Sequence, residues 1–104
     1  MEWGSLSITS TVNGDVNEVK LAGRLDVKSA KAADVAFMDA AQEAKNIVLD
    51  MSELDYIASA GLRTLKRLRG AVRENGGTLK LRGVKDSVME VFEMTGFAAM
   101  LEFE

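Results

Sequence analysis

A strand-like run followed closely by a helical pattern, between residues 47 and 72, is the strongest constraint on the fold of this chain. Ile47-Val48-Leu49 is a short apolar run with the length of a buried strand. A polar stretch follows, and the chain returns to apolar residues at Tyr56-Ile57. Apolar residues then recur at intervals of three or four, as on one face of a helix, at Leu62, Leu65, Leu68 and Val72. The pattern predicts a strand, a turn and a helix, with Ser59 just before the helix.

Ser59 is the single hydroxyl in this turn, where it stands between Ala58 and Ala60. Serine is a preferred N-cap, because its side-chain oxygen accepts a hydrogen bond from a free backbone N–H at the helix start. The same N–H groups and the positive end of the helix dipole would also hold a phosphate. Ser59 is therefore predicted as an N-cap or as a phosphoacceptor. The two roles are compatible, since a capping oxygen can be esterified later.

An N-terminal β-hairpin is predicted around the turn signal Asn13-Gly14-Asp15. Apolar and polar residues alternate on both sides of that turn, as expected for half-buried strands. The inward residues are Leu6, Ile8 and Val12, interrupted by Ser10, and then Val19 and Leu21. Trp3 precedes the hairpin and is expected to pack partly against it.

A helix with an alanine-rich face is predicted after the hairpin. Its apolar stripe consists of Ala30, Ala33, Phe37, Ala40 or Ala41, and Ala44. Small side chains allow such a helix to lie close to a sheet. Either Asp26 or Ser29 would cap its start, and the sequence does not choose between them.

The C-terminal third predicts a strand and one more helix. Asn75-Gly76-Gly77 ends the helix that follows Ser59, and alternation over residues 79–82 indicates a strand. Ser87–Glu90 matches a capping box, which predicts that the last helix is capped by Ser87. Residues 100–103 are expected to form a short strand or a packed tail.

The predicted order of elements is β-β-α-β-α-β-α, with a possible final strand. Strand–helix–strand repeats imply parallel pairing with right-handed crossovers. We expect an α/β fold with a small mixed sheet of four to five strands, an antiparallel N-terminal hairpin, and three to four helices. A length of 104 residues indicates a single domain over residues 1–104.

The composition excludes several classes of function. The chain has no histidine and no cysteine, which rules out histidine-dependent triads, disulfides and sites ligated by either residue. No phosphate-binding loop or nucleophile-elbow motif occurs, so we expect no enzymatic activity and no cofactor. The net charge of −3 argues against direct nucleic-acid binding. Without a long apolar run, no membrane insertion is expected, and the cytoplasm is the expected location.

The helix after Ser59 carries five basic residues, Arg63, Lys66, Arg67, Arg69 and Arg73. A charged run of this kind is usually a solvated helix face. It would also suit an acidic partner, and Arg63 in the first turn could reach a phosphate on Ser59. The sequence leaves both interpretations open.

Three segments resemble the STAS domain of the anti-sigma factor antagonist family, of the sporulation type. The central segment is Asp50-Met51-Ser52 followed by Tyr56-Ile57-Ala58-Ser59-Ala60-Gly61-Leu62. The outer two are Leu21-Ala22-Gly23-Arg24-Leu25-Asp26 and Val88-Met89-Glu90-Val91-Phe92-Glu93-Met94-Thr95-Gly96-Phe97. Many members of the family carry Asp or Ser at the position of Ala58, and often Ser at that of Ala60. The resemblance extends from about Leu6 to Phe103.

The resemblance implies a function and a site. The chain would bind an anti-sigma factor of the GHKL serine kinase type, and that kinase would phosphorylate Ser59 until a phosphatase reset the switch. The residues expected to contact the partner are Asp26, Ala58, Ala60, Gly61, Leu62, Arg63, Lys66 and Arg67. We expect a monomer or a weak dimer. The alternative is a STAS-type scaffold or accessory subunit, in a transporter or stress-signalling complex, that does not use Ser59 as an acceptor.

Overall fold

The computed structural model describes residues 2–3 and 6–104, and the side chains of residues 6–104. The helices are α1 (Val27–Glu43), α2 (Ser59–Glu74) and α3 (Asp86–Thr95), with a short 3-10 helix η1 (Phe97–Ala99). The strands are β1 (Glu2–Trp3), β2 (Leu6–Asn13), β3 (Val16–Leu25), β4 (Asn46–Ile57), β5 (Leu79–Arg82) and β6 (Glu102–Phe103). All six strands form one sheet and lie in it in sequence order.

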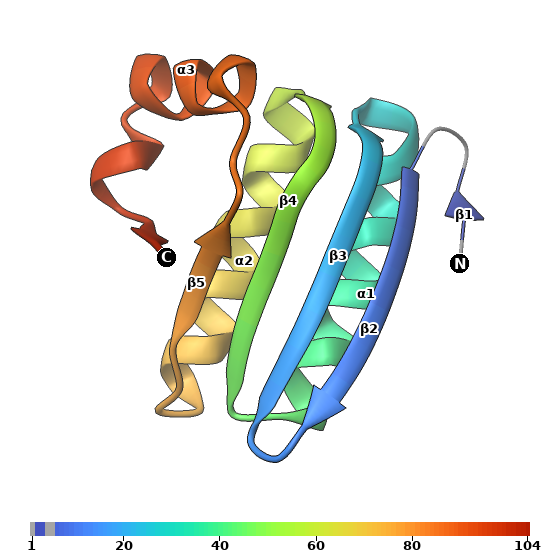
Figure 1. Ribbon diagram of the computed structural model, residues 1–104, viewed down its shortest axis with the longest axis vertical. Coiled ribbons are helices and arrows are strands. Elements are labelled where there is room, and N and C mark those ends of the chain that lie inside the picture. Colours follow the sequence, from blue (N-terminus) through green and yellow to red (C-terminus); the bar gives the residue numbers. More distant parts are fainter. Residues whose placement is uncertain (1, 4–5) are drawn as a thin grey trace.

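The sheet is mixed. β1, β2 and β3 pair antiparallel, and β3, β4, β5 and β6 pair in parallel. α1 and α2 lie side by side behind the strands in Figure 1. The expected α/β fold with an N-terminal hairpin is confirmed. The sheet has more strands than the four to five expected, because the two-residue strands β1 and β6 extend its edges.

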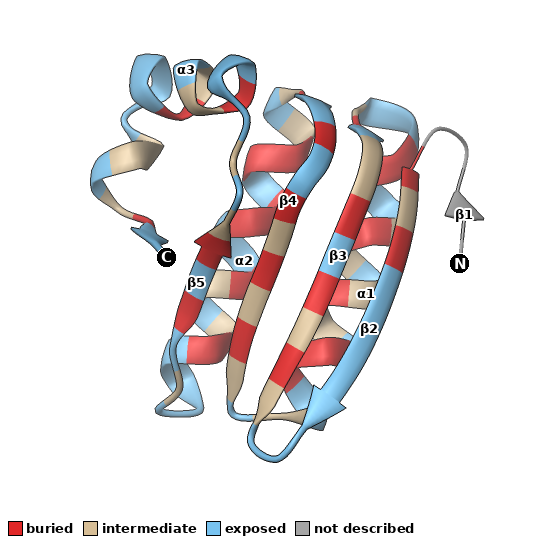
Figure 2. Ribbon diagram, in the orientation of Figure 1, coloured by how far each residue is buried: buried red, intermediate tan, exposed pale blue. Residues whose placement is uncertain are grey.

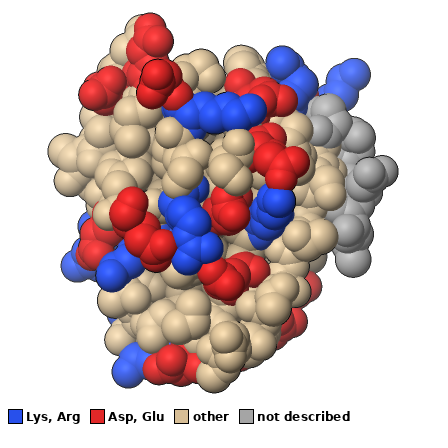
Figure 3. Space-filling model, viewed as in Figure 1, with Lys and Arg blue, Asp and Glu red and all other residues tan. Residues whose placement is uncertain are grey.

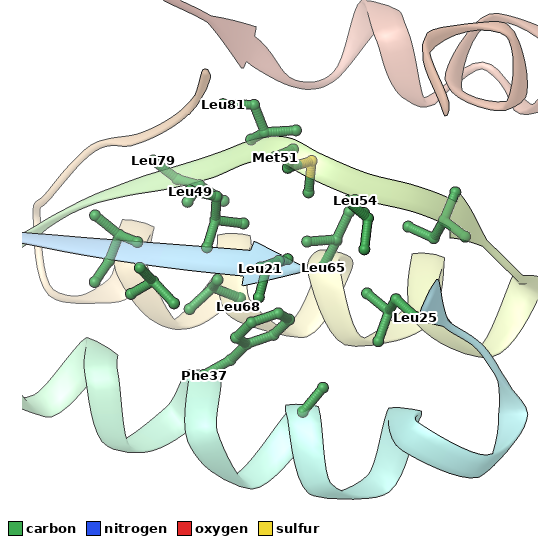
Figure 4. Close-up of a cluster of buried hydrophobic side chains, with 14 of the residues drawn as sticks. Leu21, Leu25, Phe37, Leu49, Met51, Leu54, Leu65, Leu68, Leu79 and Leu81 are labelled. Carbon is green, nitrogen blue, oxygen red and sulfur yellow. The ribbon is translucent and has the colours of Figure 1, made fainter. Parts of the chain in front are cut away.

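The core lies between the sheet and the pair α1 and α2. Figure 2 shows buried residues recurring along the strands and on the helix faces behind them. In Figure 4, Phe37 of α1 and Leu68 of α2 lie under the strands, close to Leu21. The alanine stripe of α1 is buried as predicted, at Ala30, Ala33, Ala40 and Ala41. The predicted stripe of α2 is also buried, at Leu62, Leu65, Leu68 and Val72.

β4 runs through the polar stretch that the sequence analysis placed after the strand. Met51, Leu54 and Ile57 are all buried although they are three residues apart, and side chains of a regular strand alternate between faces. Two register shifts against β3 account for this. Opposite Lys20–Ala22 and again opposite Gly23–Arg24, β4 advances by one residue more than β3. Each extra residue acts as a β-bulge, which returns the next apolar side chain to the core.

In the N-terminal strands, the structure contradicts one prediction and does not test another. Val12 was expected to face the core, but it is 46% exposed. α1 packs mainly on β3, and the half of β2 near the hairpin turn is exposed in Figure 2. The expected packing of the Trp3 side chain lies outside the described side chains.

The C-terminal elements correct one prediction and decide another. The capping box at Ser87 is wrong, because α3 begins at Asp86 and its N-cap is Lys85, without a side-chain cap. The Lys85 carbonyl already accepts the N–H groups of Val88 and Met89, so Ser87 lies inside the first turn. Of the two alternatives for the last residues, the strand is correct, since β6 pairs in parallel with β5.

Leu65→Ala is expected to lower the free energy of unfolding by about 2–5 kcal/mol, because it removes apolar burial and leaves a cavity. Met94→Ala is a suitable control, since Met94 is 80% exposed, and it should change stability by less than about 0.5 kcal/mol. Urea denaturation of both variants measures the difference. Similar costs for the two would mean that Leu65 does not lie in the core.

Candidate protein-binding site around Ser59

The candidate site lies where β3 and β4 end side by side. Leu25 and Ile57 are paired at the ends of these strands, and the Ala58 N–H donates to the Leu25 carbonyl at 2.9 Å. Parallel strands deliver the residues that follow them to the same edge of the sheet. The turn with Ser59 and the loop with Asp26 therefore share one edge of the sheet.

Ser59 is not an N-cap. α2 begins at Ser59 itself, and its N-cap is Ala58, whose methyl group cannot accept a hydrogen bond. The first bond within the helix runs from the Leu62 N–H to the Ala58 carbonyl at 3.0 Å. The N–H groups of Ser59, Ala60 and Gly61 thus have no acceptor within the helix. In the described part of the chain, the exposed Ser59 hydroxyl has no hydrogen-bond partner.

The neighbouring helix α1 has the cap that α2 lacks. Asp26 Oδ1 accepts the N–H groups of Lys28 and Ser29 at 3.0 and 3.1 Å, and Ser29 Oγ accepts the Asp26 N–H at 3.0 Å. Both residues that the sequence proposed as caps therefore act together in one capping box. The Asp26 carboxylate is engaged in its own helix, so it is less available to a partner.

The start of α2 is electropositive. Its first turn contains no acidic residue, although such residues stabilise helix N-termini through the helix dipole. Arg63 adds a positive charge one turn from Ala58 and is exposed. Free N–H groups, the dipole and a cation together form a setting that favours an anionic group at Ser59.

Gly61 and Leu62 hold the turn against the sheet. A Cβ atom on Gly61 would lie 2.7 Å from Leu25 Cγ, 2.9 Å from Ile57 Cγ1 and 3.0 Å from the Leu25 carbonyl oxygen. Only glycine permits this approach of helix and strand. The Leu62 side chain is 6% exposed. Gly61 and Leu62 therefore position the turn by packing under it, and they expose little surface to a partner.

Gly61→Ala is expected to destabilise the protein by about 1–3 kcal/mol, because the new methyl group overpacks against Leu25 and Ile57. Gly70→Ala in the same helix is the matched control. No atom lies within 4 Å of a Cβ placed there, so it should stabilise by about 0.5–1 kcal/mol through helix propensity. Thermal and urea unfolding compare the two variants. The same sign for both would contradict the close contact at Gly61.

Two exposed apolar residues lie near this edge and were not among the predicted site residues. Tyr56 is 40% exposed, and its ring centroid lies 4.2 Å from the Arg24 guanidinium carbon. The second register shift in β4, which precedes Tyr56, turns it away from the core. Val27 is 76% exposed at the first position of α1. It falls on the period of the alanine stripe, so a helical pattern alone would bury it.

The basic residues of α2 divide into engaged and available groups. Arg67 Nε lies 2.7 Å from Asp34 Oδ1, which ties α2 to α1. Arg69 Nε donates to the Met100 carbonyl at 3.1 Å. Arg63 and Lys66 are exposed, and neither forms an ion pair with any described residue. Of the three cations expected to meet a partner, Arg63 and Lys66 are therefore free to do so.

The open face of the sheet carries charges that are already paired. Figure 3 shows basic and acidic side chains interleaved over this face. Arg82 donates to Glu104 at 2.7 Å and to Glu18 at 2.6 Å, and these contacts raise the pKa of its guanidinium. Lys20 pairs with Glu53, and that hydrogen bond raises the pKa of the ammonium group. Several charges on this face are therefore neutralised within the protein, whereas Arg63 and Lys66 near Ser59 have no ion pair with a described residue.

Comparison with known proteins agrees with the fold and identifies the family. Residues 7–104 match the STAS domain, so the chain belongs to the STAS domain family. It is 42% identical over 77 residues to BtrV of Bordetella bronchiseptica, named as a candidate anti-sigma factor antagonist; the match covers 71% of this chain and 66% of BtrV.

A second relative and a solved structure extend this similarity. The anti-sigma-B factor antagonist of Bacillus subtilis is 25% identical over 85 residues, which cover 82% of this chain and 78% of that protein. The solved STAS domain protein of Planctomyces limnophilus superposes with a TM-score of 0.83 at 20% identity, over 92% of this chain and 87% of that one. No helix in the described part of the chain has the length and apolar character needed to cross a bilayer.

Proposed function

We propose that this chain is an anti-sigma factor antagonist that binds an anti-sigma factor of the GHKL serine kinase type and is released by phosphorylation of Ser59. Two curated relatives carry the name of anti-sigma factor antagonist, and both matches include most of this chain. The protein would act as a binding module and not as an enzyme, in the cytoplasm, as a monomer or weak dimer. A phosphatase would restore the unmodified form.

The observation that carries the proposal is the start of α2, which has neither a side-chain cap nor an acidic residue in its first turn, and which presents the exposed Ser59 hydroxyl. Replacing a good N-cap by alanine usually costs about 0.5–2 kcal/mol, and α1 of the same protein has a complete capping box. Breaks of a local rule of this kind tend to occur at functional sites. The cost is understandable if Ser59 must stay free and its helix end must remain open to an incoming phosphoryl group.

The other hydroxyls near the turn are engaged, which favours Ser59 as the acceptor. Ser52 Oγ donates to Asp50 Oδ1 at 2.7 Å, and the bonds from Ser52 hold the pKa of the Asp50 carboxyl below its usual range. Thr64 is buried and donates to the Gly61 carbonyl at 2.6 Å. A serine kinase that approaches the start of α2 therefore meets one exposed serine hydroxyl without a hydrogen-bond partner among the described residues, that of Ser59.

Phosphorylation would change the surface from small and neutral to strongly charged. A phosphate adds roughly −1.5 to −2 charges at pH 7. In the free protein, the N–H groups at the start of α2 and the Arg63 side chain would stabilise it. In the complex it would have to lose its water next to Ala58 and Ala60, which carry no compensating charge. A penalty of about 3 kcal/mol would weaken binding by roughly 150-fold.

The contact surface that we propose differs from the set of partner-contacting residues predicted from the sequence. It keeps Ala58, Ala60, Arg63 and Lys66 around Ser59. It adds the exposed side chains of Val27 and Tyr56, because apolar and aromatic groups at the centre of an interface contribute most of its binding energy. Asp26, Gly61, Leu62 and Arg67 would support this surface through the contacts described above.

Incubation with the partner kinase and ATP is expected to add one phosphate, at Ser59. The kinase would be captured from the source organism with the wild-type chain as bait, then purified and identified. Intact-mass spectrometry and peptide mapping locate the phosphate. Ser52→Ala should still be modified, whereas Ser59→Ala should not.

The same capture experiment, repeated with variants of Ser59 as bait, distinguishes the proposed function from a scaffold role. Ser59→Ala should retain the kinase and stay folded, since Ser59 caps no helix. Ser59→Asp should lose the kinase, because it places a charge where the partner must approach. Equal capture by both variants, or a phosphate on Ser52 or Thr64, would contradict the phosphorylation switch. Equal capture would favour the scaffold or accessory-subunit alternative.

Lys66→Glu is expected to slow association with the captured kinase several-fold at low salt and to flatten the dependence of the on-rate on salt. Charges at the rim of an interface act mainly on the on-rate, and they are screened over about 8 Å at physiological salt. Lys80→Glu is the matched control, because it makes the same charge change on β5, outside this surface. Stopped-flow measurements at several salt concentrations decide the question. Equal effects of both variants would assign Lys66 to the solvated helix face.

A further inference from the structure

A second candidate site lies at the opposite end of α2 from Ser59. A hollow of about 290 Å³ is bounded by the last turns of α2, the glycines after it, the start of β5 and residues 100–102. Arg69 is ten residues beyond Ser59, so the hollow lies about 15 Å or more along the helix axis from the first site. In Figure 1, the C-terminal segment passes along the outer edge of β5, on the side of α2 away from α1.

Two of the residues that line this hollow are arginines without a carboxylate partner. Arg69 and Arg73 both line it, and residues four apart lie on the same face of a helix. Among the described residues, no carboxylate lies within 4 Å of either group. Arg67 and Arg82, by contrast, each contact carboxylates at 2.6–2.7 Å. Two arginines on one face of the helix, neither with a carboxylate within 4 Å, leave a place for an anion.

Arg69 is held in a binding orientation before any ligand arrives. Its Nε donates to the Met100 carbonyl at 3.1 Å, and its side chain is partly buried. This contact uses one of the five N–H donors of the guanidinium and leaves its terminal amino groups available. Because the side chain is already ordered, a ligand would lose less conformational entropy in binding it.

The other residues that line the hollow determine which chemical groups a ligand could have besides its acid group. Leu79 and Leu101 line the hollow and are 7% and 8% exposed, so each offers it a small apolar surface. Gly76 and Gly77 contribute no side chain. Gly77 itself packs on the Lys45 backbone, since a Cβ there would lie 1.7 Å from the Lys45 carbonyl oxygen. The N–H groups of both glycines already donate to carbonyls of α2, at 3.0 and 2.9 Å. Recognition of an acid group therefore depends on the two arginines.

We propose that this hollow binds a small compound with one carboxylate or phosphate group and an apolar remainder. The acid group would lie between Arg69 and Arg73, and the apolar part would contact Leu79 and Leu101. Glu102 at the rim reduces the net positive charge of the site, which favours a compound with a single acid group over polyanions. The bound compound would join α2 to the segment that leads into β6.

Phenyl phosphate and benzoate are suitable probes, because each combines one acid group with a flat apolar ring. Each is titrated into the full chain at constant ionic strength, and amide chemical shifts are followed by two-dimensional NMR. At least one probe should give saturable shifts concentrated at residues 76–79 and 100–102. It should bind at least fivefold tighter than its ring-free counterpart, inorganic phosphate or acetate. The tighter probe identifies phosphate or carboxylate as the preferred acid.

Arg73→Gln tests the role of the arginines. It should weaken binding of the tighter probe at least fivefold, while Lys66→Gln, with the same charge change on the same helix, should alter it by less than twofold. Arg69→Lys keeps the charge but loses the planar donor geometry, and it should also weaken binding. A probe-dependent rise in melting temperature, absent in Arg73→Gln, gives a second measurement.

Three results would overturn the proposal: no saturable shift with either probe, shifts spread evenly over basic residues of the surface, or unchanged affinity in Arg73→Gln. None of these results depends on Ser59. The antagonist function and this second site can therefore fail or succeed separately.

Discussion

The parallel pairing of β3 with β4 supports every other part of the structure. This pair carries the largest share of the buried leucines of the sheet, and both α1 and α2 pack on it. It also ends in one place, at Leu25 and Ile57, so that the loop after β3 and the turn after β4 emerge together. The approach of Gly61 to Leu25 then fixes where α2 begins. The position of Ser59 follows from strand pairing and from one glycine, without a contact of its own.

The two helix starts at this edge have opposite chemistry, although they lie side by side. α1 closes its N-terminus with Asp26 and Ser29, whereas α2 leaves its first N–H groups open beside a free hydroxyl. α3 also begins without a side-chain cap, but Asp86 places a negative charge in its first turn, and α2 has no such residue. The capped start of α1 therefore lies beside the open start of α2. There, the proposed partner would meet Ser59 between the small neutral side chains of Ala58 and Ala60.

Charge is distributed in a way that supports this division. The open face of the sheet is covered by ion pairs, as at Arg82, and exposed pairs of this kind add little net stability. They do neutralise several of the charges on that face. α2 carries three cations without an ion pair to a described residue, Arg63 and Lys66 near Ser59 and Arg73 at the far end. One helix thus carries the proposed phosphorylation switch at its start and the proposed anion site at its end.

The sequence by itself determined the α/β class, the order of elements, the alanine face of α1, the leucine face of α2 and the place of Ser59 at a helix start. These features follow from local periodicity and turn residues, which need no knowledge of neighbours. Tertiary structure decided the rest. The two bulges in β4, which bury Leu54 and expose Tyr56, arise only from register against β3. The choice of Ala58 over Ser59 as the N-cap, the burial of Gly61, and the ion pair of Arg67 with Asp34 also depend on contacts between segments far apart in the chain. A local sequence pattern cannot predict these features, because each depends on contacts with a segment that is distant in the sequence.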